Sequence, residues 1–336
     1  MIKNKIIQSS LAFLMLSSAS YAKDIIIELP KVPEVPKVIT IQNTQKVSST
    51  NNDDVLQDKK VKFSNHVAPV IQKSTATDSK STKIGDIKNG RVSANLNIPY
   101  QNVDNLSKRL NNAGFNIISS YTFCKDGRIT SLVITNPELI KNASKTDRGF
   151  GATLRITVDN QAKTVTINNP LYALKTTMQT QYDKDLALSV LDTLRKEFSK
   201  LSETQEVLKF SALDNFQFMP GMPKYQNMQV IAKKSNNELL NSARKSKRVV
   251  FEQKLENGAI LVGVKLSDAT TKFIKNTGFK NAALLPYPVL IQNNEAKILD
   301  PKYYIAVMYP KLKMSQFMSI AAVPDAITKD IDKVFR

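Results

Sequence analysis

The stretch ITSLVITNPELI, residues 129–140, places a strand signal directly before a helix signal. Ile129–Ile134 is a short, largely apolar run rich in β-branched residues, which predicts a strand. Asn136 then supplies an N-cap and Pro137 the first helical position, so a helix is expected to begin as soon as the strand ends. This segment predicts a mixed fold, and the sequence on either side extends the pattern.

Helix and hairpin signals surround this segment in the first half of the chain. Apolar residues at helical spacing from Val103 to Ala113, followed by Gly114, predict a helix with its natural stop. Alternating apolar residues over 154–158 and 165–167, on both sides of a polar turn, predict a β-hairpin. The range 183–198 has a helical apolar face. These elements together indicate the α+β class.

The second half carries a similar series of signals. We expect a helix over 237–245, a hairpin over 249–264 around Asn257-Gly258, a helix capped by Ser267, a hairpin over 284–299, a strand over 303–309 and a helix that begins at Ser315.

The two halves can be aligned at an offset of about 130 residues, as expected for one duplicated domain. Thr135–Glu138 falls opposite Leu266–Ala269, and Asn169-Pro170 falls opposite Asp300-Pro301. We therefore predict a tandem repeat of two related modules, each a small antiparallel or mixed sheet with helices packed on it. The predicted bounds are 95–200 and 230–336, with 201–229 as the linker.

The two copies resemble the domain-of-unknown-function family 302. The resemblance rests on the helix that ends at Gly114-Phe115, the strand leading into Thr135-Asn136-Pro137, the hairpin closing at Asn169-Pro170, and Leu284-Leu285-Pro286 before a strand in the second copy. It implies an α+β fold and no agreed activity. Members often carry a Cys before the Asn-Pro and another after the Leu-Pro, where this chain has Thr135 and Tyr287, so no thiol role carries over to these positions.

The N-terminus reads as an export signal. Lys3 and Lys5 precede a short apolar run, and Ser20 and Ala22 form a small-x-small cleavage site, so we expect a signal peptide over 1–22, cut after Ala22. The apolar run is shorter than the roughly 20 residues that span a bilayer, and no transmembrane segment is expected in the mature chain. A periplasmic protein is predicted, with a secreted one as the alternative. Residues 23–94 are rich in proline and polar residues and are predicted to form a flexible arm.

Composition excludes several function classes. With one His (His66) and one Cys (Cys124), the chain cannot assemble a typical zinc or iron–sulfur site or an internal disulfide framework. The formal charge is +19, so this is a basic protein suited to anionic envelope material. Aromatic residues interleaved with clustered arginine are missing, and nucleic acid is not expected as a partner.

Three groups of residues are candidates for chemistry or binding. Cys124 stands beside Lys125 and is a candidate reactive thiol or an intermolecular disulfide partner, although a small semi-buried residue is the simpler interpretation. Met219, Met222 and Met228 offer soft sulfur ligands for copper, or apolar packing between the two modules. Four tyrosines form a candidate ligand or partner surface, or part of the core: Tyr287, Tyr303, Tyr304 and Tyr309.

No pair of residues forms a recognisable catalytic site, so no catalytic residue and no cofactor are predicted. The expected function is that of an exported, non-enzymatic protein that binds a ligand, an envelope component or a periplasmic protein, with peripheral contact to anionic lipid. The alternatives are copper or redox handling and a structural role in envelope assembly.

Overall fold

The computed structural model describes residues 82–123 and 127–336. The predicted signal peptide, His66, Cys124 and the predicted arm up to residue 81 lie outside these residues. Within the described ranges, no helix is both long and apolar enough to cross a membrane.

The first module is built on a six-stranded antiparallel sheet. In sheet order its strands are β3 (Asn116–Phe123), β4 (Ile129–Thr135), β5 (Leu154–Asp159), β6 (Thr164–Asn168), β2 (Asn95–Ile98) and β7 (Ser202–Glu203). Its helices are α1 (Val103–Asn112), α2 (Pro137–Ala143), α3 (Pro170–Met178) and α4 (Lys184–Glu197). Every residue of β4 and β5 is buried, including the polar residues that alternate with the apolar ones in β5.

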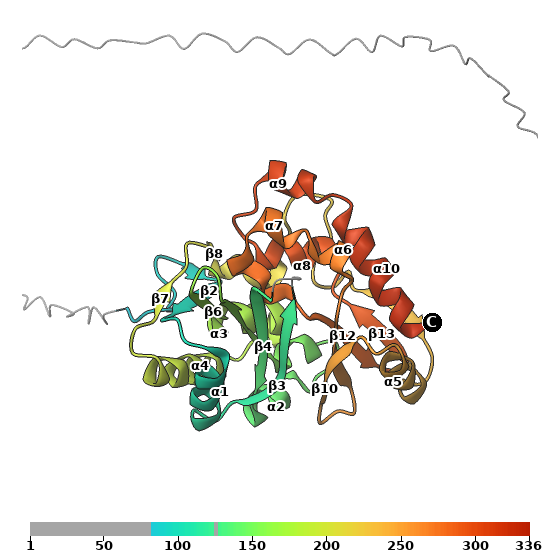
Figure 1. Cartoon of the computed structure of the whole chain (residues 1–336), viewed down its shortest axis with the longest axis horizontal. Helices are drawn as coiled ribbons and strands as arrows, with labels where there is room; N and C mark the ends of the chain where they lie inside the picture. The colour runs from blue at the N-terminus through green and yellow to red at the C-terminus, as the bar shows by residue number, and fades with distance from the viewer. Residues whose placement is uncertain (1–81, 124–126) are drawn as a thin grey trace, which may run out of the picture. The chain divides into compact units, whose positions relative to one another are not determined.

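The second module is built on a five-stranded antiparallel sheet. In sheet order its strands are β10 (Val249–Lys254), β11 (Ile260–Val264), β12 (Tyr287–Gln292), β13 (Glu295–Ile298) and β9 (Gln229–Lys233). Its helices are α5 (Asn236–Lys245), α6 (Asp268–Thr271), α7 (Ile274–Thr277), α8 (Pro301–Met308), α9 (Met314–Ser319) and α10 (Val323–Phe335). Helices and antiparallel sheets packed together confirm the α+β class (Figure 1).

The two sheets have the same strand order. The order β10-β11-β12-β13-β9 repeats β3-β4-β5-β6-β2, with α5 and α8 in the places of α1 and α3. An irregularity in strand pairing also recurs at the same place, between Ile117 and Ser119 in β3 and between Val249 and Phe251 in β10. This shared topology supports the duplication, which itself stays a prediction.

Local capping explains where several helices begin. Asn136, Asn169, Ser267 and Asp300 each accept a hydrogen bond from a backbone N–H in the first turn of the helix that follows. Proline occupies the first turn of α2, α3 and α8, where its missing N–H leaves no backbone bond unmade.

The structure corrects three boundaries or elements. The strand expected over Tyr303–Tyr309 is wrong, because these residues form most of α8 and the turn after it. The arm does not extend to residue 94: β1 (Arg91–Ser93) pairs with β8 (Val207–Lys209), and Val92 and Ala94 are buried. The segment 201–229 is more than a connection, because β7 completes the sheet of the first module.

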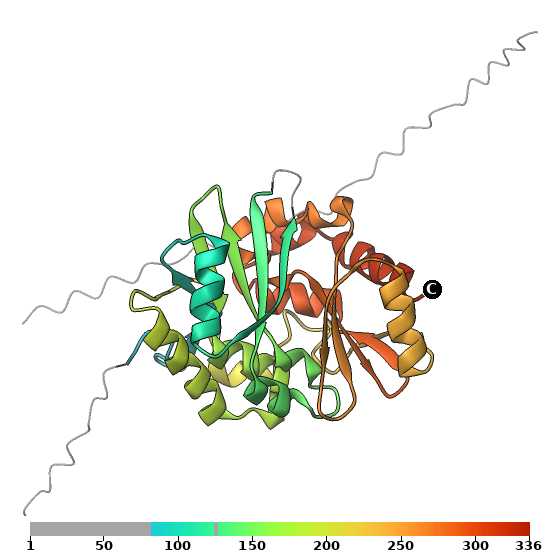
Figure 2. The ribbon, with the colours of Figure 1, turned by 60° about the horizontal axis from the view of Figure 1, so that its bottom comes forward.

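The two modules pack through a reciprocal exchange. The 3₁₀ helix η1 (Gly149–Ala152) of the first module lies against β11 and β12, and η4 (Phe279–Leu284) of the second lies against β4, β5 and β6. The Ser131 hydroxyl donates to the Leu285 carbonyl oxygen across the contact, at 2.7 Å and fully buried. The two sheets therefore lie side by side, and each is contacted by a 3₁₀ helix of the other module (Figure 2).

Candidate functional site

The four predicted tyrosines are buried side chains. Tyr287 is fully buried, its ring centroid lies 5.4 Å from that of Tyr304, and its hydroxyl donates to the Leu299 carbonyl at 2.9 Å. Burial raises the pKa of the Tyr287 hydroxyl well above its ordinary value. Tyr303, Tyr304 and Tyr309 are also less than a tenth exposed, so these tyrosines offer no surface to a macromolecular partner.

Two of these tyrosines instead lie where the modules meet. Tyr303 of α8 donates to the Thr176 carbonyl of α3 at 3.5 Å, and Tyr172 of α3 donates to the Val307 carbonyl of α8 at 2.6 Å. Each tyrosine stands three residues after its helix's N-cap, and each acceptor seven residues after. The two hydrogen bonds therefore join equivalent positions of the two modules in a reciprocal way, as the contacts of η1 and η4 do.

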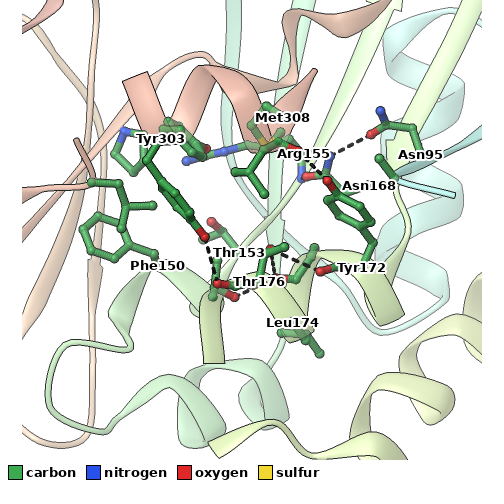
Figure 3. Close-up of a pocket in the computed structure, with 17 residues that line it drawn as sticks. Asn95, Phe150, Thr153, Arg155, Asn168, Tyr172, Leu174, Thr176, Tyr303 and Met308 are labelled. Carbon is green, nitrogen blue, oxygen red and sulfur yellow. Dashed lines mark hydrogen bonds between the residues drawn. The ribbon is translucent and has the colours of Figure 1, made fainter. Parts of the chain in front are cut away.

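A small cavity of about 40 Å³ lies between α3 and α8 (Figure 3). Tyr303, Tyr304 and Arg155 line it together with Asn95 and Asn168. The Asn168 side-chain amide donates to Asn95 Oδ1 at 2.9 Å, and Asn168 Oδ1 accepts from the Arg155 backbone N–H at 3.0 Å. The cavity is polar on the side of the first module.

The three candidate sulfur ligands have different surroundings. Met219 is 40% exposed, whereas Met222 and Met228 are partly buried and pack against the core. Met228 also lines a hollow with Asp147 and Glu295. Within residues 82–123 and 127–336, no three or more His, Cys, Asp or Glu side chains are grouped to hold a metal ion. Copper binding by these methionines stays a prediction.

A second, larger concavity lies in the second module, between α6–α7 and α9–α10. This groove, which we call the apical groove, has a volume of about 490 Å³, within the usual range of ligand sites. Its walls are apolar at Phe273, Ile320 and Val323. Lys272 and Lys275 are its charged lining residues, and no carboxylate lines it.

An exposed face of α9 adjoins the apical groove. Met314 is 45% and Met318 62% exposed, while Phe317 on the same helix is buried against the core. The ring of Phe218 lies 5.2 Å from that of Phe317, so the exposed Met219 follows a residue that is anchored on α9. These three methionines are half of the six large apolar side chains that are exposed in the described ranges, which indicates an apolar patch.

Lysines flank this patch. Lys311 and Lys313 come shortly before Met314 in the sequence. Lys272 and Lys275 line the apical groove together with Ser319 and Ile320, at the C-terminal end of α9. Among the described residues, no carboxylate lies within 4.0 Å of these four ammonium groups. We call Lys311, Lys313, Met314 and Met318 the α9 surface. Its charge and its apolar side chains are both directed to solvent.

The chain has no match to a protein-family model, to a curated protein or to a solved structure. The resemblance to family 302 therefore stays a prediction. The sequence predicts a helix that begins at Ser315, and the α9 surface was missed. Two lysines followed by Met314 and Met318 were a signal, but methionine usually lies in the core, and exposure is a property of the folded chain.

Proposed function

We propose that this chain is an exported, non-enzymatic protein that binds the anionic surface of a membrane in the cell envelope through its α9 surface. The observation that carries the proposal is the exposure of Met314 and Met318 beside lysines that have no carboxylate partner within residues 82–123 and 127–336. Export rests on the signal predicted over residues 1–22.

Two physical effects support binding at this place. Lysines near an anionic lipid surface are worth about 1 kcal/mol each, and apolar side chains that enter the interface add the free energy of removing their surface from water. The α9 surface presents both kinds of side chain on one short helix and the residues before it. The apical groove lies beside it, with apolar walls and two lysines, and suits an anionic amphiphile.

Figure 1 places α9 at one end of the described part of the chain, away from α1 and α4. This arrangement supplies a matched control, because α1 and α4 carry the exposed Lys108 and Lys196, which form no ion pair among the described residues. Removing two charges there changes the net charge as much as removing them at Lys311 and Lys313.

The test is co-sedimentation of the exported, purified protein with vesicles. We expect binding to vesicles that contain phosphatidylglycerol and little to pure phosphatidylcholine. The Lys311→Gln/Lys313→Gln variant should bind about 30-fold more weakly, from about 1 kcal/mol per lysine, and Lys108→Gln/Lys196→Gln should bind nearly as the wild type. Equal losses in the two variants would show that net charge, and not the α9 surface, is responsible.

The methionines are tested separately. Met314→Ser/Met318→Ser keeps every charge and should weaken binding at high salt, where the electrostatic attraction is screened. Unchanged binding of this variant at high salt would contradict insertion of the α9 surface. A metal assay on the same preparations addresses the copper alternative at Met219, Met222 and Met228.

A further inference from the structure

Arg155 is a buried cation without an acidic partner in the part of the chain that the structure describes. It is 3% exposed, and its Nη1 has no hydrogen-bond partner among those residues. No carboxylate of the described chain lies within ion-pair distance of it, and its guanidinium is contacted by the Phe251 ring, 5.1 Å from the centroid, and by the Tyr304 hydroxyl. A buried guanidinium normally has a carboxylate or several acceptors, because removing the charge from water is costly.

The cavity beside Arg155 fixes the size of what can compensate this charge. By the measure in which one water needs roughly 10–15 Å³, about 40 Å³ has room for a few waters or one small anion and is too small for a larger organic anion. The residues around it offer donors more than negative charge, since no Asp or Glu lines the cavity.

The cavity is lined by residues from equivalent positions of the two modules, but the positive charge is present in the first module only. Arg155 is the second residue of β5, and Pro288, the second residue of β12, also lines the cavity. Asn168 and Leu299 are a second such pair, each directly before an N-cap. Packing of the repeat therefore does not account for an arginine here, because its counterpart is an apolar residue.

We propose that a halide ion, chloride in the cell, occupies this cavity and is held by the Arg155 guanidinium and the Tyr304 hydroxyl, since both residues line it. Arg155 can donate to the Tyr304 oxygen, which leaves the tyrosine proton free to donate to the anion. A neutral water would leave the buried positive charge uncompensated, whereas a halide neutralises it in a low-dielectric site. Because Arg155 belongs to the first module and Tyr304 to the second, the ion joins the two modules.

The first experiment measures thermal unfolding of the full chain in sodium chloride, sodium bromide and sodium gluconate at equal ionic strength. The gluconate ion is too large for the cavity. We expect the Tm to rise saturably with chloride and bromide over gluconate. Tyr304→Phe, which keeps the ring, should raise the halide midpoint about tenfold, as expected for losing one hydrogen bond to an ion.

Arg155→Gln should abolish the halide dependence, and Arg91→Gln, which alters an exposed arginine, should preserve it. An equal halide effect in wild type and Arg155→Gln would overturn the proposal. If Arg155→Gln does not fold, crystals of the wild type soaked in bromide decide the question: an anomalous peak in the cavity beside the Arg155 guanidinium supports the site, and its absence at full soak overturns it.

Discussion

At the scale of single residues, Gly263 leaves the space that the ring of Phe251 occupies. These residues are directly opposite in the β10–β11 pair, and a Cβ added at Gly263 would lie 2.0 Å from a ring carbon of Phe251. The same ring contacts the buried guanidinium of Arg155. The absence of a side chain at Gly263 thus lets the ring lie across the strand.

Gly263→Ala should therefore lower the free energy of unfolding by about 1–3 kcal/mol, the usual cost of overpacking a core. Urea unfolding followed by circular dichroism measures this loss. Adding Phe251→Leu to Gly263→Ala should recover part of it, since the smaller side chain can move aside. Wild-type stability of the single variant would mean that the ring is not held over Gly263.

At the scale of elements, α10 is fixed to the sheet side of the second module through Asp330. Asp330 is only 4% exposed. Its carboxylate accepts from the Ser267 backbone N–H and the Thr270 hydroxyl, both at 2.8 Å, and lies 3.6 Å from Arg248 Nη2. The Asp330 side chain therefore joins α10 to the start of α6 and to Arg248, the residue directly before β10.

Replacement of Asp330 by asparagine should cost about 1–3 kcal/mol, because buried donors lose a charged acceptor. Asp332→Asn is the matched control two residues away: its ion pair with Arg336 is exposed and should contribute under 1 kcal/mol. Similar unfolding free energies for the two variants would contradict the anchoring role.

The same contacts predict that the free energy of unfolding falls at acidic pH. Burial alone acts to raise the pKa of Asp330, but the hydrogen bonds from Ser267 and Thr270 and the charge of Arg248 outweigh it and hold the pKa below its ordinary 3.8. A carboxyl with a lowered folded pKa stabilises the fold above its unfolded pKa, and this stability is lost as the pH falls through the folded value. Urea unfolding below about pH 4 should show a smaller loss in Asp330→Asn than in wild type, and parallel losses would contradict this.

How far the sequence predicts elements depends on how local their causes are. The N-caps at Asn136 and Ser267 and the hairpin turn at Asn257-Gly258 are encoded within a few residues, and these elements were predicted correctly. α8 was taken for a strand because both of its sides are buried, so that no polar face marks the helical period. α3, its counterpart, is also largely buried and was not predicted at all.

At the scale of the whole described unit, the sites depend on contacts between distant residues. Arg155 and Tyr304 come from different modules, and no local spacing predicts that they meet. The α9 surface depends on Phe317 turning inward, which leaves Met314 and Met318 outside. The order of the elements can be read from the sequence, and it predicted the alignment of the two halves. The reciprocal packing of η1 and η4 cannot be read from it, because this packing arises only when both modules are folded.

This reciprocal packing predicts that the two modules unfold together. Tyr172 and Tyr303 each form a hydrogen bond to the other module, but at 2.6 Å and 3.5 Å the two hydrogen bonds are unequal, and the longer one is at the limit of such a bond. Tyr172→Phe should cost about 1–2 kcal/mol, because it leaves the Val307 carbonyl unpaired, and Tyr303→Phe less than about 0.5 kcal/mol. Urea unfolding followed by near- and far-ultraviolet circular dichroism should give one coincident transition for wild type and both variants, with the m-value unchanged. A second transition in wild type would show that the modules unfold independently, since only a shared interface makes the stability of each module depend on the other. An equal cost for the two substitutions would show that the two hydrogen bonds do not differ in strength as their lengths indicate.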